Sequence, residues 1–501
     1  MASKPNILFI LPDQQRPDSL GCYGSEVAIT PTLDWLAETG VRFDNCYVQN
    51  PLCCPSRYSV LTGRYPHTHG VRANWYAPRV NEVSFAHQLG RVGYNTAAIG
   101  KMHLTPWQDN FGFDGRIIAE AKFHADCPDD YARFLNKHGY SRKTLYDENS
   151  TEYKRRLSCL TSILPQELHI DSFVGQSICE YLNTIEGPFC AFASFLSPHN
   201  PYDPPKPYDG LFKNTPMPPK NMGKDEINQK PREAYDYLNN RLKWGVKSDE
   251  ITEEQRLDMW RNYYALNTLI DDWMAKIIQV LKQRGLYENT IIIYSSDHGD
   301  LLGDHGLYYK QCFYEQSVRV PLIIHAPGFF KPQQVDEKVE LMDIYSTICE
   351  LGGAQQGFGA QSTSLVPILK QLEHPIREAV FSENYFGRMV RWMDWKMVYY
   401  PGKPYGELYN LVDDPQEQVN LWTSMEGSFE KRYMKDLLLE WAFATEDRMP
   451  LPVRPDHQDY TPIQYLLHNG GTRESDIQPW HLPKMSGFYQ NYTFSIDGRT
   501  R

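Results

Sequence analysis

The sequence predicts an α/β protein in which helices flank a large, mostly parallel sheet and a smaller antiparallel sheet follows. Three observations lead to this prediction. Short apolar runs typical of buried parallel strands alternate with helical patterns as far as about residue 370. Beyond that point, four short strand-like segments follow one another, as in a small antiparallel sheet. Several apolar runs also end in polar clusters, at the strand ends where open α/β sheets place their ligands.

The elements of the first half follow from apolar runs and from residues that start or stop helices. Residues 6–11 are a short apolar run that ends at a turn residue, as expected of a buried strand. Residues 30–38 begin with Thr-Pro and are followed by Gly40, which predicts a helix. Residues 107–165 lack clean periodicity, and we expect them to form insertions over one face of the sheet. The same criteria predict strands at 41–43 and 95–99 and helices at 56–61 and 84–92.

The second half contains the longest helical pattern and the last strands. Apolar residues recur mostly every three or four positions across 252–284, and Gly285 ends this helix. Further strands of the large sheet are predicted at 188–195, 290–294 and 320–325, with a helix at 342–351. The small sheet is predicted at 379–382, 389–392, 396–400 and 407–411, with a helix near 430–445 packed on it. We therefore divide the chain into an α/β domain, 1–370, and a C-terminal subdomain, 371–501, that ends in an extended tail.

The composition argues against several classes of protein. The 501 residues carry a net charge of −11, from 51 Lys and Arg against 62 Asp and Glu. Neither nucleic acid nor an anionic membrane is therefore expected as the main partner. Ten cysteines without Cys-x-x-Cys spacing argue against zinc ribbons and a disulfide framework. The first residues hold only a five-residue apolar run before Pro12, which predicts a cytoplasmic protein or one whose leader has been removed.

The most informative stretch runs from Pro51 to Arg64, PLCCPSRYSVLTGR. Pro55 and Ser56 start helices and Gly63 stops them, so Cys53 should lie just outside a helix N-terminus. A group there faces free backbone N–H donors, which favour an anion such as sulfate or phosphate and make a cysteine unusually reactive. For an arbitrary Cys-Cys pair, a buried hydrophobic cap would be the better interpretation.

This stretch resembles the sulfatase pattern Cys-x-Pro-Ser-Arg-x-x-x-Leu-Thr-Gly-Arg and matches every fixed position from Cys53 to Arg64. A match at every fixed position outweighs the interpretation of the Cys-Cys pair as a buried hydrophobic cap. The resemblance covers nearly the whole chain and implies an alkaline phosphatase-like fold, with residues 1–370 as the catalytic domain. It also implies that a formylglycine-generating maturation enzyme oxidises Cys53, and not Cys54, and that the formylglycine hydrate is the nucleophile.

The resemblance further implies a divalent metal ion. Asp13, Gln14, Asp297 and His298 match the family's ligand positions, and the modified Cys53 completes the set. Oxygen ligands suit Ca²⁺ or Mg²⁺, whereas an imidazole is better suited to Mn²⁺ or Zn²⁺, so Ca²⁺ is only narrowly preferred. The commonest sulfatase pattern has Asp in place of Gln14 and Asn in place of His298. The residues of this chain resemble the choline-sulfatase and phosphonate-monoester-hydrolase branches.

Catalytic roles are implied in the same way, residue by residue. Arg57 and Lys101 resemble the cations that hold the hydrate and neutralise the sulfate. His103 resembles the base that takes a proton from the second hydroxyl of the hydrate. His199 and Lys310 resemble the groups that bind the sulfate oxygens and assist the leaving alcohol. A lone His or Lys is ordinarily structural, so the inference depends on their joint occurrence in the order of the family.

The predicted reaction is hydrolysis of a sulfate ester, of a sulfated mono- or oligosaccharide or of a small organic sulfate such as choline sulfate. Asn74 matches a position where related enzymes contact the substrate. Hydrolysis of phosphonate monoesters or phosphodiesters by the same nucleophile is the alternative, motivated by Gln14 and His298. A third hypothesis is a binding protein whose Cys53 is never oxidised, which nothing in the sequence favours. The extended tail would suit a dimer or tetramer.

Overall fold

The computed structural model describes residues 4–79, 82–122, 128–142, 145, 150–223, 247–372 and 377–446. The described residues belong to one compact unit, Met1–Asp447. The predicted C-terminal tail lies outside them. Among the residues described, none of the helices combines the length and apolar character that crossing a membrane requires.

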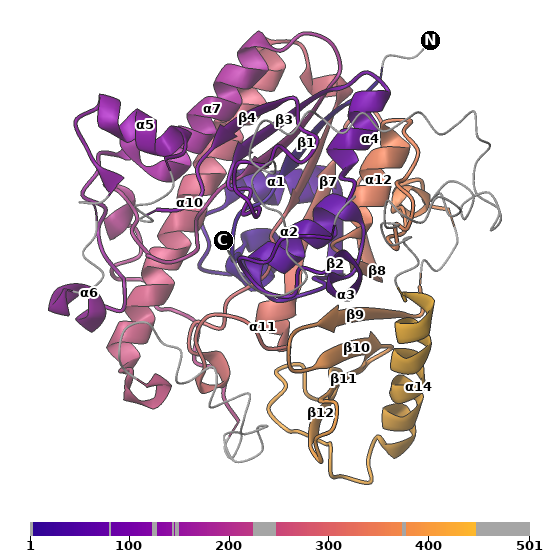
Figure 1. Ribbon diagram of the computed structural model, residues 1–501. Helices are drawn as coiled ribbons and strands as arrows, with labels where there is room; N and C mark the ends of the chain where they lie inside the picture. Colours follow the sequence, from indigo (N-terminus) through magenta and orange to yellow (C-terminus); the bar gives the residue numbers. More distant parts are fainter. Residues whose placement is uncertain are drawn as a thin grey trace, which may run out of the picture. The chain divides into compact units, whose positions relative to one another are not determined.

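An eight-stranded sheet forms the centre of this unit (Figure 1). Its strands are β1 (Asn6–Ile10), β2 (Val41–Tyr47), β3 (Asn95–Gly100), β4 (Gly115–Ile118), β5 (Phe189–Ser194), β6 (Thr290–Ser295), β7 (Arg319–His325) and β8 (Gln333–Glu340). They lie in the order β4-β3-β5-β1-β6-β7-β2-β8, and only β7 runs antiparallel to its neighbours, β6 and β2. The prediction of a large, mostly parallel sheet is confirmed.

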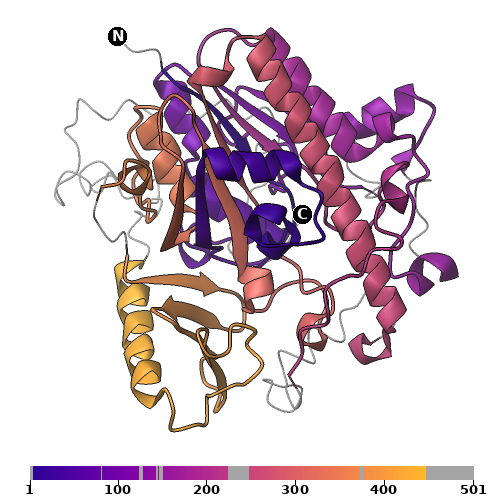
Figure 2. The same cartoon turned by 180° about the vertical axis from the view of Figure 1, so that it is seen from behind.

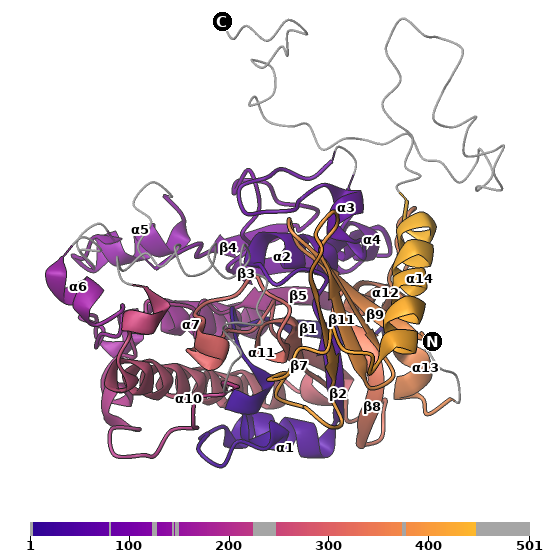
Figure 3. The ribbon, with the colours of Figure 1, turned by 90° about the horizontal axis from the view of Figure 1, so that it is seen from below.

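Helices cover both faces of the sheet, because alternate residues of β1 pack into different cores. Leu8 and Ile10 join the core under α1, α7 and α10, whereas Ile7 and Phe9 join the core under α2, α4 and α12. Figures 2 and 3 show these two sets of helices on opposite sides of the sheet. The helices of this domain are α1 (Pro31–Thr39), α2 (Cys53–Thr62), α3 (Pro66–His69), α4 (Phe85–Arg91), α5 (Asp130–Lys137), α6 (Thr151–Arg155), α7 (Ile170–Thr184), α10 (Glu253–Gln283), α11 (Glu315–Val318), α12 (Asp343–Leu351) and α13 (Val366–Leu369).

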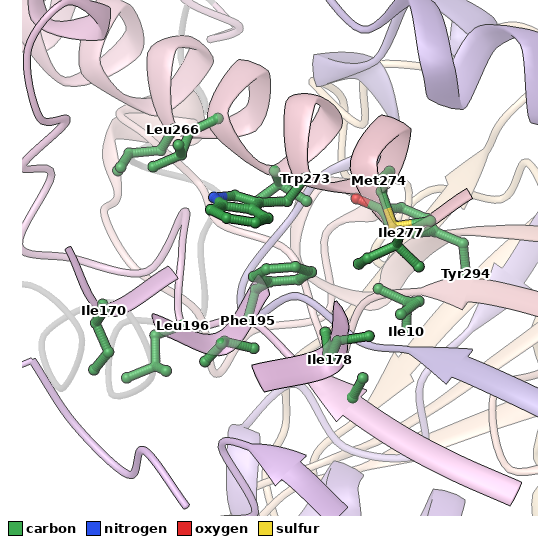
Figure 4. Packing of buried hydrophobic residues seen from close by; sticks show 14 of the residues in the cluster. Ile10, Ile170, Ile178, Phe195, Leu196, Leu266, Trp273, Met274, Ile277 and Tyr294 are labelled. Carbon is green, nitrogen blue, oxygen red and sulfur yellow. The ribbon is translucent and has the colours of Figure 1, made fainter. Parts of the chain in front are cut away.

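The long helix α10 is the main cover of one face. It begins after Thr252, whose side chain accepts a hydrogen bond from the N–H of Gln255 in a capping box. Its apolar face packs on β1, β6 and α7, where Trp273 and Ile277 lie among buried side chains (Figure 4). The helix and its apolar face were predicted to within one residue at each end, because the pattern is long and strongly periodic.

Several elements of the large domain were not predicted from the sequence patterns. Strand β8 has the sequence QQVDEKVE, whose polar residues lack the pattern of a buried strand. It lies at the edge of the sheet and, among the described strands, pairs with β2 alone. Strand β4 has four residues, too few for a period, and lies inside the stretch predicted as insertions over one face. That prediction is wrong for β4, which instead extends the sheet edge beside β3. Helix α7 was not predicted either.

The C-terminal region forms the small antiparallel sheet that was predicted. It contains β9 (Ala379–Glu383), β10 (Arg388–Trp392), β11 (Trp395–Tyr399) and β12 (Gly406–Asn410), in the order β12-β11-β10-β9. Helix α14 (Ser428–Ala444) packs Met434, Leu438 and Trp441 against this sheet. The boundary at residue 370 stays a prediction.

Candidate active site

Helix α2 carries the cysteine motif, and its first residue is Cys53. The prediction that Cys53 lies just outside the helix is therefore wrong. Pro55 is tolerated inside the first turn because the N–H that it lacks would have no partner within the helix. The N–H of Cys54 instead donates to Oδ1 of Asn74 at 3.1 Å. Cys53 is 1% exposed, so its Sγ lies at a buried helix N-terminus.

Four strand ends bring the predicted polar residues to this helix. Asp13 and Gln14 follow β1, Lys101 and His103 follow β3, His199 follows β5, and Asp297 and His298 follow β6. The register is fixed by backbone hydrogen bonds across the strand ends, with Leu11 N–H donating to the Ala193 carbonyl and Lys101 N–H to that of Ser194. This edge of the sheet therefore gathers side chains that are far apart in the sequence.

The side chains of Asp13, Cys53, Asp297 and His298 converge closely. One potential ligand atom from each lies within 4.8 Å of all the others, and all four residues are buried. Cys53 Sγ lies 3.0 Å from His298 Nε2 and 3.8 Å from Asp13 Oδ1. His298 Nε2 lies 3.7 Å from Asp297 Oδ1 and 3.8 Å from Asp13 Oδ1.

Arg57 binds the two carboxylates of this cluster from within α2. Its guanidinium donates to Asp297 Oδ2 at 2.8 Å and to Asp13 Oδ2 at 3.2 Å. The same group donates to the Lys101 carbonyl and to Ser194 Oγ, both at 2.8 Å. Most of its donors are thus committed to the protein, and the predicted contact with the hydrate stays a prediction.

Cations and burial together set the charge of the site. Burial alone would raise the pKa of Asp13, but Lys101, His199 and Arg57 lower it below its usual range. The Lys101 ammonium lies 2.6 Å from Asp13 Oδ2. Burial would also raise the pKa of the Cys53 thiol, yet Lys310, His298 and Lys101 hold it well below its usual range. An anion at position 53 is therefore favoured.

The two remaining imidazoles are neutral near pH 7. Burial and the charge of Lys101 lower the pKa of His103 to about 4. Burial and the charge of Lys310 do the same for His199. His103 Nδ1 is buried and has no hydrogen-bond partner among the described residues, so this nitrogen is available to a bound ligand.

Gln14 and Lys310 meet beside the cluster. The backbone N–H of Gln14 donates to Asp297 Oδ1 at 3.0 Å, and the side-chain oxygen Oε1 of Gln14 accepts a hydrogen bond from Lys310 Nζ. Two further residues support the site and were missed from the sequence, Ser194 under Arg57 and Asp300 beside Gln14. Asp300 stands in the same short run as Asp297 and His298, which was a usable signal, whereas nothing around Ser194 distinguishes it.

This arrangement fits a divalent cation. Asp13, Asp297 and His298 offer two carboxylates and an imidazole nitrogen beside position 53. Gln14, whose backbone N–H binds Asp297, would add an amide oxygen, which here accepts a hydrogen bond from Lys310. Carboxylate and amide oxygens suit Ca²⁺, and the imidazole equally allows Mn²⁺. The identity of the metal stays open.

The comparisons with known proteins point to one family. The Sulfatase family model matches residues 5–354, and the model for the C-terminal region of N-sulphoglucosamine sulphohydrolase matches 303–442. The chain belongs to the sulfatase family. This sulfatase is a sulfuric ester hydrolase, and its family generally uses a metal ion and a formylglycine.

Similar proteins align with this sulfatase over most of their length. An arylsulfatase of Clostridium perfringens is 29% identical over 469 residues, which is 87% of this chain and 94% of the relative. An N-acetylglucosamine-6-O-sulfatase of Bacteroides thetaiotaomicron is 26% identical over 518 residues, 89% of this chain and 88% of the relative. The crystal structure of a phosphonate monoester hydrolase of Agrobacterium radiobacter shares the fold with a TM-score of 0.77 at 24% identity, covering 90% of this chain and all of that one.

Proposed function

We propose that this sulfatase removes sulfate from sulfated carbohydrates, with the oxidised side chain of Cys53 as its nucleophile. The observation that carries the proposal is the convergence of Asp13, Asp297 and His298 on the buried Cys53, with ligand atoms within 4.8 Å of one another. The relative from Bacteroides thetaiotaomicron is named for a sulfated sugar, which supports a carbohydrate as the class of substrate.

The residues around Cys53 account for both charge and proton transfer. A divalent metal held by Asp13, Gln14, Asp297 and His298 would stabilise negative charge on the oxygens of the nucleophile and the sulfate. Oxidation of Cys53 to formylglycine supplies a hydrated aldehyde, whose hydroxyl can attack sulfur. Lys101 and Lys310 place fixed positive charge beside this position, which offsets the charge of the sulfate.

The neutral imidazoles suit acid–base work. His103 has a pKa of about 4, so near pH 7 its ring is free to accept a proton from the nucleophile's second hydroxyl. His199 and Lys310 lie close to each other and to position 53, where Lys310 can donate a proton or a hydrogen bond to the departing alcohol oxygen. The alcohol then leaves without developing a full negative charge.

Side-by-side assays test the proposal. Purified protein from a host with formylglycine-generating activity should release sulfate from N-acetylglucosamine 6-sulfate and from 4-nitrophenyl sulfate. Treatment with a chelator should abolish this release, and Ca²⁺ or Mn²⁺ should restore it. Release that survives chelation, or its absence on every sulfate ester, would contradict the proposal.

A second candidate is hydrolysis of phosphonate monoesters or phosphodiesters. Gln14 and His298 favour it, since both depart from the commonest sulfatase pattern. The structural likeness to the phosphonate monoester hydrolase concerns the fold alone. Phenyl phosphonate monoesters should therefore be assayed beside the sulfates, and a large preference for the phosphonate would replace the first proposal.

A further inference from the structure

The imidazoles of His103 and His199 lie on the side of the site that faces solvent. Asp13, Cys53, Asp297 and His298 are buried, whereas His103 and His199 are partly exposed. A sulfate bound beside Cys53 must therefore direct its ester oxygen, and the alcohol beyond it, toward the imidazole side. Residues that border His103 are the ones that a substrate's organic part will meet.

Trp75 is such a residue. Its ring lies edge-on to His103, with ring centroids 5.6 Å apart. The preceding residue, Asn74, binds the N–H of Cys54 through its side chain, so the segment is tied to the start of α2. Trp75 is nevertheless 70% exposed to solvent. A large aromatic surface thus stays in water directly beside the predicted base.

The backbone of Trp75 reinforces this observation. Its φ is +73°, in the left-handed region that a bulky side chain rarely adopts. Residues kept in such conformations cost free energy and cluster at binding and active sites. Glycine or asparagine would satisfy this backbone more easily, and an exposed indole gains little from packing. Trp75 thus combines an unusual backbone conformation with an exposed indole directly beside the predicted base.

We propose that Trp75 is the platform on which a sugar ring of the substrate stacks while its sulfate lies beside Cys53. This proposal rests on the proposed function and names the part of the site that selects a carbohydrate. A flat aromatic face suits the apolar face of a pyranose ring. A small quaternary ammonium such as choline is instead held by aromatic rings that surround it, and a residue as exposed as Trp75 does not enclose a ligand.

The test compares two substrates of different shape on matched variants. Trp75→Ala should lower kcat/KM for N-acetylglucosamine 6-sulfate by about tenfold to 100-fold, because the transition state would lose its contact with the aromatic face. It should change kcat/KM for choline sulfate less than about threefold, since that substrate has no ring to stack. Trp75→Phe should recover most of the loss, because it keeps an aromatic face.

Phe358→Ala is the matched control, because Phe358 is also exposed, at 56%, and lies in a turn after α12, which carries none of the site residues. It should leave both substrates unaffected. Equal effects of Trp75→Ala on the two substrates, or none on either, would overturn the inference while leaving the proposed function intact. A wild-type enzyme that releases no sulfate from any saccharide would overturn both.

A second inference comes from a different observation, the buried surroundings of Gln14. Gln14 Nε2 donates to Asp300 Oδ2, while Gln14 Oε1 accepts from Lys310. An amide held between a carboxylate and an ammonium has only one orientation that satisfies both partners. Asp300 is fully buried, so water does not compete for this bond.

Asp300 acts as an acceptor at both of its oxygens. Besides Gln14, its Oδ2 accepts from the Tyr202 hydroxyl at 2.8 Å, and its Oδ1 accepts from the N–H of Leu302 at 3.2 Å. An asparagine at position 300 would turn one of these contacts into two facing donors. The site therefore requires a carboxylate and not an amide behind Gln14.

We infer that Asp300 is a positioning residue that fixes the side-chain amide of Gln14 in one orientation, with its nitrogen toward Asp300 and its oxygen beside Lys310, where that oxygen would be open to a bound metal. Metal affinity is the readout that separates this role from a structural one. Asp300→Asn should weaken binding of Ca²⁺ and Mn²⁺, measured by calorimetry on the matured enzyme, by about tenfold to 100-fold. In the Gln14→Ala background, Asp300→Asn should not weaken metal binding further, because the amide that Asp300 positions is absent.

Tyr202→Phe provides the comparison, since it removes the other donor to the same Asp300 oxygen but leaves the bond to Gln14. It should change metal affinity less than about threefold. Thermal unfolding of each variant shows whether it is folded. An unchanged affinity in folded Asp300→Asn, or additive effects of the Gln14 and Asp300 substitutions, would overturn the inference.

Discussion

Replacing Arg57 with methionine should destabilise the protein strongly, and more so without metal. The fully buried guanidinium makes two ion pairs, at 2.8 Å to Asp297 and 3.2 Å to Asp13. Lys101 remains at 2.6 Å from Asp13 after the substitution, so Asp297 is the carboxylate that loses its main partner. Removing one partner of a buried ion pair costs about 3–5 kcal/mol, and we expect a loss of this size in a chelator.

A divalent metal should reduce this loss. The ion would replace the positive charge that Arg57 supplied to the two carboxylates, so metal should stabilise Arg57→Met by more than it stabilises the wild type. Urea unfolding, measured once with chelator and once with saturating Ca²⁺, gives the four free energies needed. Arg155→Met is the control, because Arg155 forms an exposed pair with Glu152 at 2.8 Å and should cost less than about 1 kcal/mol. A loss below about 1 kcal/mol for Arg57→Met in chelator, or one that metal leaves unchanged, would refute the reasoning.

Three other substitutions test the remaining structure. Lys396→Met should cost about 3–5 kcal/mol in chemical unfolding, because the buried Lys396 pairs with Glu315 and Glu417 and both carboxylates would lose it; a loss under about 1 kcal/mol would contradict this. Gly100→Ala should lower both the melting temperature and sulfate release, since its Cβ would lie 2.0 Å from the Ser194 carbonyl oxygen at a φ of +93° and displace Lys101; wild-type values would be inconsistent with the geometry. Burial raises the pKa of Asp271 from 3.8 to about 6, so the stability of the wild type relative to Asp271→Asn should be greatest below about pH 4 and fall by roughly 3 kcal/mol as the pH rises through about 6. Urea unfolding across this pH range checks the sign, and a difference that is flat or rises with pH would show that Asp271 does not titrate in this way.

The parts of the fold that could be predicted are those with a local signal. The period of α10, with its stop at Gly285, and the β-branched run of β6 are visible in the sequence itself. Strand β8 could not be predicted, because its place is decided by pairing with β2 while its own residues are mostly polar. Cys53 was predicted to lie outside the helix because Pro55 and Ser56 are helix-starting residues, whereas α2 begins at Cys53 itself.

The site shows the same division. The residues that carry the chemistry lie in short motifs after strands, so Asp13, Lys101 and Asp297 could be named from the sequence. The residues that hold them in place could not, because their roles depend on how strands are ordered. Ser194 reaches Arg57 because β5 lies between β3 and β1, whose ends Arg57 also binds. Asp300 meets Gln14 because β6 lies on the other side of β1.

The mass of the peptide that contains Cys53 tests the central claim most directly. The protein should be produced in a host with formylglycine-generating activity, and the peptide compared with that from Cys54→Ala. In both proteins the peptide should show the loss expected when the sulfur at position 53 is replaced by an aldehyde oxygen. A sulfur-containing side chain at position 53 in protein that releases sulfate at full rate would contradict the account.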